Sequence, residues 1–133
     1  MLEYGVMMPY SNISCFSTTR HGGYGQGAYA TFNCTHYCGD NPEHVKENLN
    51  FVKAFLKNVK TNPSEREDVL IIPRQTHTTN VRIIEDIPSE EDLQDVDALV
   101  TRLKGFCLCV STADCVPILI YDSVKQVVAA VHA

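Results

Sequence analysis

The sequence predicts an α+β fold, with a mixed or mainly antiparallel β-sheet in the back half and a helix packed on it. Residues 97–101, 106–111, 116–121 and 126–131 are short apolar runs separated by turn residues, which is typical of strands. The front half instead contains one long segment, beginning near Asp40, in which apolar residues recur at helical spacing. A chain of 133 residues is long enough for one domain with a substantial core.

The predicted helix begins with a strong start signal. Asp40 or Asn41 can cap its first turn, and Pro42 suits the first helical position because that position needs no backbone donor. We expect the helix to end near Asn58, before a polar loop at 60–68. The residues of its predicted apolar face are Val45, Leu49, Val52, Phe55 and Leu56.

Two further strands and two loops complete the expected elements. Residues 13–17 predict a short strand, and a strand beginning at 69–73 is expected to run on past Gln75 to Ile84. The acidic segment 85–96 predicts a loop. A glycine loop, which can adopt positive φ and let a ligand approach the backbone, contains Gly22, Gly23, Gly25 and Gly27.

Charge and composition narrow the class of protein. The chain has 16 acidic and 11 basic residues and a formal net charge of -5, which argues against a nucleic-acid partner. No segment approaches the ~18 apolar residues of a membrane span, and the first residues do not resemble a secretory signal. We therefore expect a cytoplasmic protein, a monomer or homodimer, whose six cysteines are thiols or metal ligands.

The end of the chain is unusual for a domain. Residues 126–133 read as a buried strand that stops, whereas chain termini usually lie in surface segments. We expect the chain to be the front part of a larger domain. An edge or face of this last strand should then be left uncovered by the chain itself.

Three residues of the types that bind transition metals lie in or beside strand-like runs. Cys115 precedes one run, His132 ends another, and a hairpin of 116–121 with 126–131 would bring the two residues near the same end. His77 follows Gln75-Thr76. Zinc favours such a mixture of thiolate and imidazole ligands. The spacing alone is weak, because single histidines and cysteines more often serve in packing.

An ordered series of segments resembles a known family. Together these segments resemble the multicopper polyphenol oxidase, or laccase-domain, family, also called the YfiH family. The resemblance extends from about Cys15 to Ala133, and it implies that residues 1–133 are the N-terminal part of a single catalytic domain. The segments are FSTTRHGGYGQGAY (16–29), GDNPEHVKENL (39–49), PRQTHTTNV (73–81), DVDALVT (95–101), STADCVPILIYD (111–122) and VVAAVHA (127–133).

The resemblance implies a fold, an activity and a metal. The fold would be a β-sandwich core with flanking helices, related to a deamidating toxin that has a Cys–His pair. Members resembling this chain are described as purine nucleoside phosphorylases acting on adenosine, inosine and methylthioadenosine, with adenosine deaminase activity. The metal ligands of the family fall on His77, Cys115 and His132, which would also be the catalytic residues. The expected ion is Zn²⁺, with Cu²⁺ as the alternative that the older family name implies.

Three other residues are candidates for binding the nucleoside and phosphate. Arg20 could bind phosphate as a bidentate donor, or be an ordinary surface arginine. Asn33 could donate a hydrogen bond to substrate, or cap a turn. Asp114 could orient a metal ligand, or cap the turn before Cys115.

Three rival functions remain open from the sequence. In a metal-free hydrolase or deamidase, Cys115 would be the nucleophile and His132 its base, and His77 would not be needed. A non-catalytic nucleoside-binding module would keep the glycine loop but would not need Cys115 as a thiolate. A copper-dependent polyphenol oxidase would use the same three ligands with a different metal.

Overall fold

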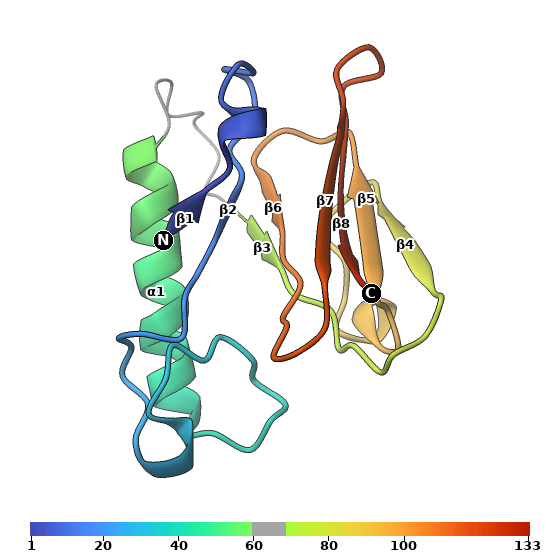
Figure 1. Ribbon diagram of the computed structural model, residues 1–133. Coiled ribbons are helices and arrows are strands. Elements are labelled where there is room, and N and C mark those ends of the chain that lie inside the picture. Colours follow the sequence, from blue (N-terminus) through green and yellow to red (C-terminus); the bar gives the residue numbers. More distant parts are fainter. Residues whose placement is uncertain (60–68) are drawn as a thin grey trace. The chain divides into compact units, whose positions relative to one another are not determined.

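The protein forms two compact units, Met1–Pro63 and Ser64–Ala133, in a computed structural model that describes residues 1–59 and 69–133 (Figure 1). It has mixed β-sheets and, in the described ranges, one α-helix, so the predicted α+β class is confirmed. The predicted polar loop at 60–68 lies outside the described residues. Packing of the helix on the sheet stays a prediction. Within the described ranges, no helix has the length and apolar character needed to cross a membrane.

Helix α1, Pro42–Val59, begins where the sequence predicts. The side-chain Oδ1 of Asn41 accepts a hydrogen bond from the Glu43 N–H at 3.0 Å, which caps the first turn. Asn48 is also fully buried, which the sequence did not predict. Its amide bonds the carbonyl of Asn33 at 2.7 Å and the N–H of Tyr24 at 3.0 Å. The buried apolar positions of the helix include Val45, Val52 and Leu56.

The rest of the first unit is short elements and loops. The other elements are β1 (Leu2–Glu3), the 3-10 helix η1 (Gly5–Met7), β2 (Phe16–Ser17) and the 3-10 helix η2 (Gly27–Tyr29). Strand β2 is antiparallel to β1 and shorter than the predicted 13–17. Gly23 has φ 90°, and a Cβ there would lie 2.9 Å from the Cα of Phe32. The glycine loop is therefore also needed for close packing of backbone on backbone.

The second unit contains a four-stranded sheet of order β4-β5-β8-β7 and a two-stranded sheet of β3 with β6 (Figure 1). Strand β8 lies between β5 and β7 and is antiparallel to both, whereas β4–β5 and β3–β6 are parallel pairs. The predicted hairpin is confirmed. The elements are β3 (Val69–Ile71), β4 (Val81–Ile84), the 3-10 helix η3 (Glu91–Leu93), β5 (Ala98–Thr101), β6 (Phe106–Leu108), β7 (Pro117–Asp122) and β8 (Val127–His132).

The two sheets of this unit share one hydrophobic core. Its buried members come from both sheets and from the segment before β5, and partly buried side chains of β3 and β6 pack against them. This is a small sandwich, in which apolar faces of two sheets are removed from water together. The buried members are Ile71, Ile84, Val96 and Leu99.

In the second unit, two further predicted strands are wrong in length. The expected strand through Ile84 is divided into β3 and β4, because the backbone between them bonds to a side chain and His77 has φ 60°. Strand β6 ends at Leu108 instead of continuing to residue 111. Beyond it, the Ser111 N–H donates to the side-chain Oε1 of Gln75 at 2.7 Å in place of a strand partner. In both segments, side chains thus accept the backbone hydrogen bonds that a neighbouring strand would otherwise accept.

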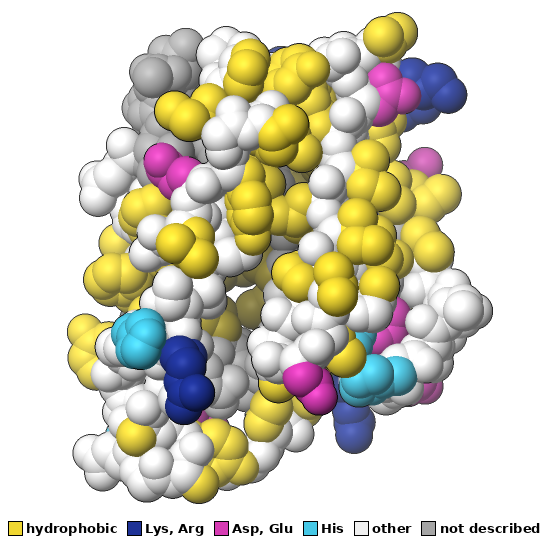
Figure 2. Space-filling model, in the orientation of Figure 1, with side chains coloured by type: hydrophobic (Ala, Val, Ile, Leu, Met, Phe, Trp, Pro, Cys, Tyr) yellow, Lys and Arg dark blue, Asp and Glu magenta, His cyan; other side chains and the backbone are white. Residues whose placement is uncertain are grey.

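The face of the four-stranded sheet opposite the core is apolar and partly open. Strand register places Val81 and Ile83 of β4 on the same face as Ile118 and Ile120 of β7. These four side chains are 43–64% exposed. Hydrophobic side chains gather over the strands of this unit in the space-filling view (Figure 2). Both edges of β8 are paired, so the expected uncovered part of the last strand is not an edge.

Candidate metal centre

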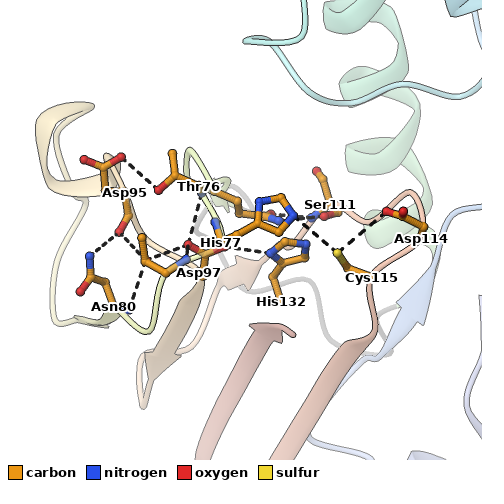
Figure 3. Close-up of polar contacts among 11 residues, drawn as sticks. Thr76, His77, Asn80, Asp95, Asp97, Ser111, Asp114, Cys115 and His132 are labelled. Atoms are coloured by element: carbon orange, nitrogen blue, oxygen red, sulfur yellow. Dashed lines mark hydrogen bonds and ion pairs between the residues drawn. The ribbon is translucent and has the colours of Figure 1, made fainter.

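Three side chains from separate segments converge in the second unit (Figure 3). One ligand atom from each of His77, Cys115 and His132 lies within 4.8 Å of the other two. The Sγ of Cys115 is 3.6 Å from the Nε2 of His77. The two histidine rings are 4.8 Å apart between centroids and inclined at 73°. The structure therefore brings together the three residues that the sequence singled out.

The β7–β8 hairpin sets two of these positions. His132 is the last residue of β8 and pairs with Pro117, the first residue of β7. Beyond the strand ends, the N–H of Val116 donates to the carbonyl of Ala133 at 2.7 Å, and the Ala133 N–H donates back at 3.0 Å. This extension of the ladder holds Cys115 beside His132 across the hairpin.

His77 comes from the connection between β3 and β4. Its φ of 60° is uncommon for a residue other than glycine, and such a conformation requires support from its surroundings. The ring is exposed, whereas His132 is only 8% exposed. Histidine side chains reach the surface beside acidic ones at the lower right of the space-filling view (Figure 2). The group thus has one open side, as a site that receives a substrate requires.

A buried carboxylate forms a hydrogen bond with one histidine of this group. Asp97, 2% exposed, lies just before β5, and its Oδ1 is 2.8 Å from the Nδ1 of His132. Burial acts to raise the pKa of Asp97. Hydrogen bonds donated by Thr78, His132 and Thr76 outweigh that effect and hold the pKa well below its ordinary value. Asp97 is therefore an anion at neutral pH.

Sequence reasoning missed Asp97 and proposed Asp114 as the supporting acid. Asp114 is exposed, and its Oδ1 lies 3.9 Å from the Sγ of Cys115. The carboxylate in hydrogen-bond contact with a histidine of the group is Asp97. One signal was available, because an aspartate entering an apolar strand must be buried or bonded. Nothing in the sequence indicated which residue it would contact.

The other candidate substrate contacts lie in the first unit. Arg20 is exposed, and its backbone carbonyl accepts a hydrogen bond from the N–H of Phe32 at 3.2 Å. The side chain of Asn33 bonds within its own loop, to Asp40 at 3.0 Å and to the N–H of Thr35 at 2.9 Å. That pattern is the turn-capping role considered from the sequence. As substrate contacts, Arg20 and Asn33 stay predictions.

The donor set fits a borderline-soft ion. One thiolate and two imidazoles suit zinc, and with zinc–ligand bonds of about 2.0–2.3 Å two tetrahedral ligands lie roughly 3.6 Å apart. The observed Cys115–His77 separation of 3.6 Å has that value. Small movements of the rings would bring the third ligand to the same distance. His77, Cys115 and His132 are thus able to hold one metal ion.

Comparison with known proteins agrees with these features. A family model described as multi-copper polyphenol oxidoreductase laccase matches residues 14–133. A purine nucleoside phosphorylase of Bacteroides thetaiotaomicron is 46% identical over 140 residues, covering 100% of this chain and 49% of the relative. A protein named adenosine deaminase, from an unknown prokaryotic organism, is 40% identical over 128 residues, covering 91% and 46%.

Solved structures also align with most of this chain but with less than half of their own length. A Neisseria meningitidis protein aligns with TM-score 0.67 and 34% identity, covering 87% of this chain and 43% of its own. The YfiH protein of Bacillus licheniformis aligns with TM-score 0.70 and 25% identity, covering 86% and 43%. The chain thus spans about half the length of the curated relatives it matches. On this similarity, the chain belongs to the multi-copper polyphenol oxidoreductase laccase family, whose solved members include YfiH.

Proposed function

We propose that this chain supplies the metal centre of a zinc-dependent purine nucleoside phosphorylase that also deaminates adenosine. The observation that carries the proposal is the convergence of His77, Cys115 and His132 within 4.8 Å. The names of two relatives, a purine nucleoside phosphorylase and an adenosine deaminase, support the substrate class. Adenosine, inosine and methylthioadenosine are the proposed substrates, with phosphate as the second reactant.

The proposed chemistry follows from the donor set. Three protein ligands leave a fourth tetrahedral position open, and a zinc ion there would polarise a substrate oxygen or lower the pKa of a bound water. In phosphorolysis, the bond from the ribose carbon to the purine nitrogen breaks and a bond from that carbon to a phosphate oxygen forms. In deamination, water replaces the amino group, which leaves as ammonia.

The residues of this chain would bind and orient the nucleoside and phosphate. His77, on the exposed side, lies nearest to where an incoming substrate would meet the group. Arg20 is the proposed phosphate donor, because a guanidinium matches phosphate geometry with two hydrogen bonds. Asn33 and Asp114 are the other proposed substrate contacts.

Metal analysis combined with turnover tests the proposal. The purified protein, loaded with zinc, is expected to bind about one ion per chain. It is expected to release purine from adenosine only when phosphate is present, and to release ammonia without it. A chelator should abolish both activities, and zinc should restore them. Zinc binding with neither product would favour a nucleoside-binding module, and phenol oxidation by a copper-loaded sample would favour the oxidase.

One contact favours a second candidate, a metal-free cysteine hydrolase or deamidase. The Sγ of Cys115 is within hydrogen-bond distance of the Nε2 of His77, so a base lies next to a nucleophile. The sequence had assigned that base to His132 instead. Turnover that survives complete metal removal but is lost in Cys115→Ser would establish the hydrolase and overturn the zinc proposal.

A further inference from the structure

One carboxylate contacts the segments that carry two of the three proposed metal ligands. The Oδ1 of Asp97 lies 2.8 Å from the Nδ1 of His132 and accepts from the backbone N–H of His77 at 3.1 Å. Its Oδ2 accepts from the N–H groups of Thr76 at 3.2 Å and Thr78 at 2.9 Å, and from the Thr78 hydroxyl at 2.9 Å. Both carboxylate oxygens of the buried Asp97 thus bond to His132 or to residues 76–78 (Figure 3).

The contact with His132 determines which ring nitrogen faces the site. An ionised carboxylate only accepts hydrogen bonds, so the Nδ1 of His132 must carry the proton. The Nε2 is then left with a lone pair, which is the form a metal requires. The neutral ring would otherwise exchange its proton between the two nitrogens.

The contacts with residues 76–78 act on the second histidine through the backbone. Three consecutive N–H groups point at one carboxylate, and the middle one belongs to His77. Its left-handed conformation, φ 60°, is unfavourable for a residue other than glycine unless the surroundings stabilise it. The converging N–H groups provide that stabilisation, because a buried anion without its donors would be far less favourable.

We infer that Asp97 is a positioning residue that sets the ring tautomer of His132 and the backbone conformation of His77 together. The consequence for metal binding rests on the proposed zinc function, whereas the tautomer and the loop conformation do not. Asp97 is buried, so it acts through the two histidines that it contacts. Carboxylates that orient histidine ligands commonly strengthen metal binding by about 10–100-fold.

The test compares Asp97→Asn with the matched variant Asp95→Asn. Each substitution removes one negative charge, and the two positions are two residues apart. Asp95 is exposed, its side chain accepts from the Thr76 hydroxyl at 3.1 Å, and its φ of 54° also suits asparagine. In Asp97→Asn, one carboxylate oxygen becomes an NH₂ group that must face donors, whichever way the amide is turned.

Two measurements are made on each protein. Zinc affinity, from competition with a chromophoric chelator, is expected to fall about 10–100-fold in Asp97→Asn and to change less than about twofold in Asp95→Asn. The ¹⁵N chemical shifts of His132 are recorded without metal, well above the usual histidine pKa of about 6.5. They should show the Nδ1–H tautomer in the wild type and in Asp95→Asn, and a mixture in Asp97→Asn.

The two readouts separate the possible failures. A wild type whose His132 carries its proton on Nε2 would overturn the inference, even if Asp97→Asn fails to fold. So would an Asp97→Asn protein that keeps wild-type zinc affinity and the wild-type tautomer. If the wild type shows the Nδ1–H tautomer but binds no zinc, the proposed function fails and the positioning role of Asp97 stands.

Discussion

At the scale of the residue, the candidate site depends on side chains that are distant in sequence but lie a few ångströms from one another. Cys115 and His77 are 38 positions apart and their side-chain atoms are 3.6 Å apart. Asp97 is 35 positions from His132 and bonds its ring at 2.8 Å. The group of His77, Cys115 and His132 therefore depends on contacts between segments distant in sequence, and each of its members can be tested separately.

Removing one ligand should remove the metal. His77→Ala is expected to lower bound zinc and adenosine phosphorolysis by about tenfold or more, because a lost direct ligand costs at least as much as a lost supporting contact. Elemental analysis after dialysis and an assay for released purine measure the two effects. His36→Ala, which changes an exposed histidine of the first unit, should leave both unchanged. Full turnover in a zinc-free His77→Ala protein would contradict the metal mechanism.

The thiol of Cys34 should react slowly. Burial raises the pKa of Cys34 to about 11, because desolvation disfavours the thiolate. At about pH 8 an alkylating reagent should label Cys34 roughly a hundredfold more slowly than an ordinary cysteine, since only the thiolate reacts. Mass spectrometry of peptides separates Cys34 from the exposed Cys38. Equal labelling of the two before unfolding would contradict this prediction.

The same shift has a consequence for stability. Because the folded pKa of Cys34 is raised, its stabilising contribution is complete below the ordinary value of 9.0 and is lost as the pH rises through about 11. Replacing Cys34 by Ala should remove this part of the alkaline loss of stability. Denaturant midpoints across that range measure it.

At the scale of the element, local sequence determined how the helix begins and long-range bonds determined where strands stop. Helix α1 starts at Pro42, after the cap that the sequence predicts. The segment between β3 and β4 is polar and would suit a strand or a loop equally. Its conformation follows from hydrogen bonds to Asp97, which the segment itself does not contain.

The helix cap should contribute measurably to stability. Asn41→Ala is expected to lower the free energy of unfolding by about 0.5–2 kcal/mol, because the Glu43 N–H loses its partner. Urea denaturation followed by circular dichroism measures this change. Asn50→Ala, at an exposed position inside the helix, should be neutral or slightly stabilising, since alanine has the higher helix propensity. Equal losses from both variants would show that the cap has no specific effect.

At the scale of the whole molecule, each compact unit has one feature that isolated elements would not show. In the first unit, the buried Asn48 joins helix α1 to the loop backbone at Tyr24 and Asn33. In the second, two sheets enclose one core while the other face of the larger sheet stays apolar and partly exposed. Apolar faces of that kind tend to associate with other apolar surfaces.

Polar substitution on this face should reduce its affinity for apolar probes. The double variant Ile83→Thr and Ile118→Thr keeps strand propensity, and we expect it to bind the dye ANS about half as strongly or less. The control, Val6→Thr and Val124→Thr, changes side chains that are 76% and 91% exposed but lie outside the sheet faces. Its dye binding should stay close to that of the wild type. Equal reductions would show that the sheet face is not the dominant apolar surface.

The sequence by itself determined the parts that depend on neighbours along the chain. The start of α1, the β7–β8 hairpin and the α+β class follow from capping residues and from the spacing of apolar side chains. The ordered motifs identified the family and the three candidate metal-ligand residues. Spacing alone did not, because single histidines and cysteines are common in cores and on surfaces.

Tertiary structure alone decided the arrangement around those three residues. Asp97, which the sequence did not single out, bonds the ring of His132, His77 adopted a left-handed conformation, and Asn48 turned a polar side chain into the buried face of the helix. Each of these depends on a polar group finding partners 15 or more positions away. Residue spacing encodes which face of an element is apolar, but the partner of a buried polar group is determined only when distant segments meet.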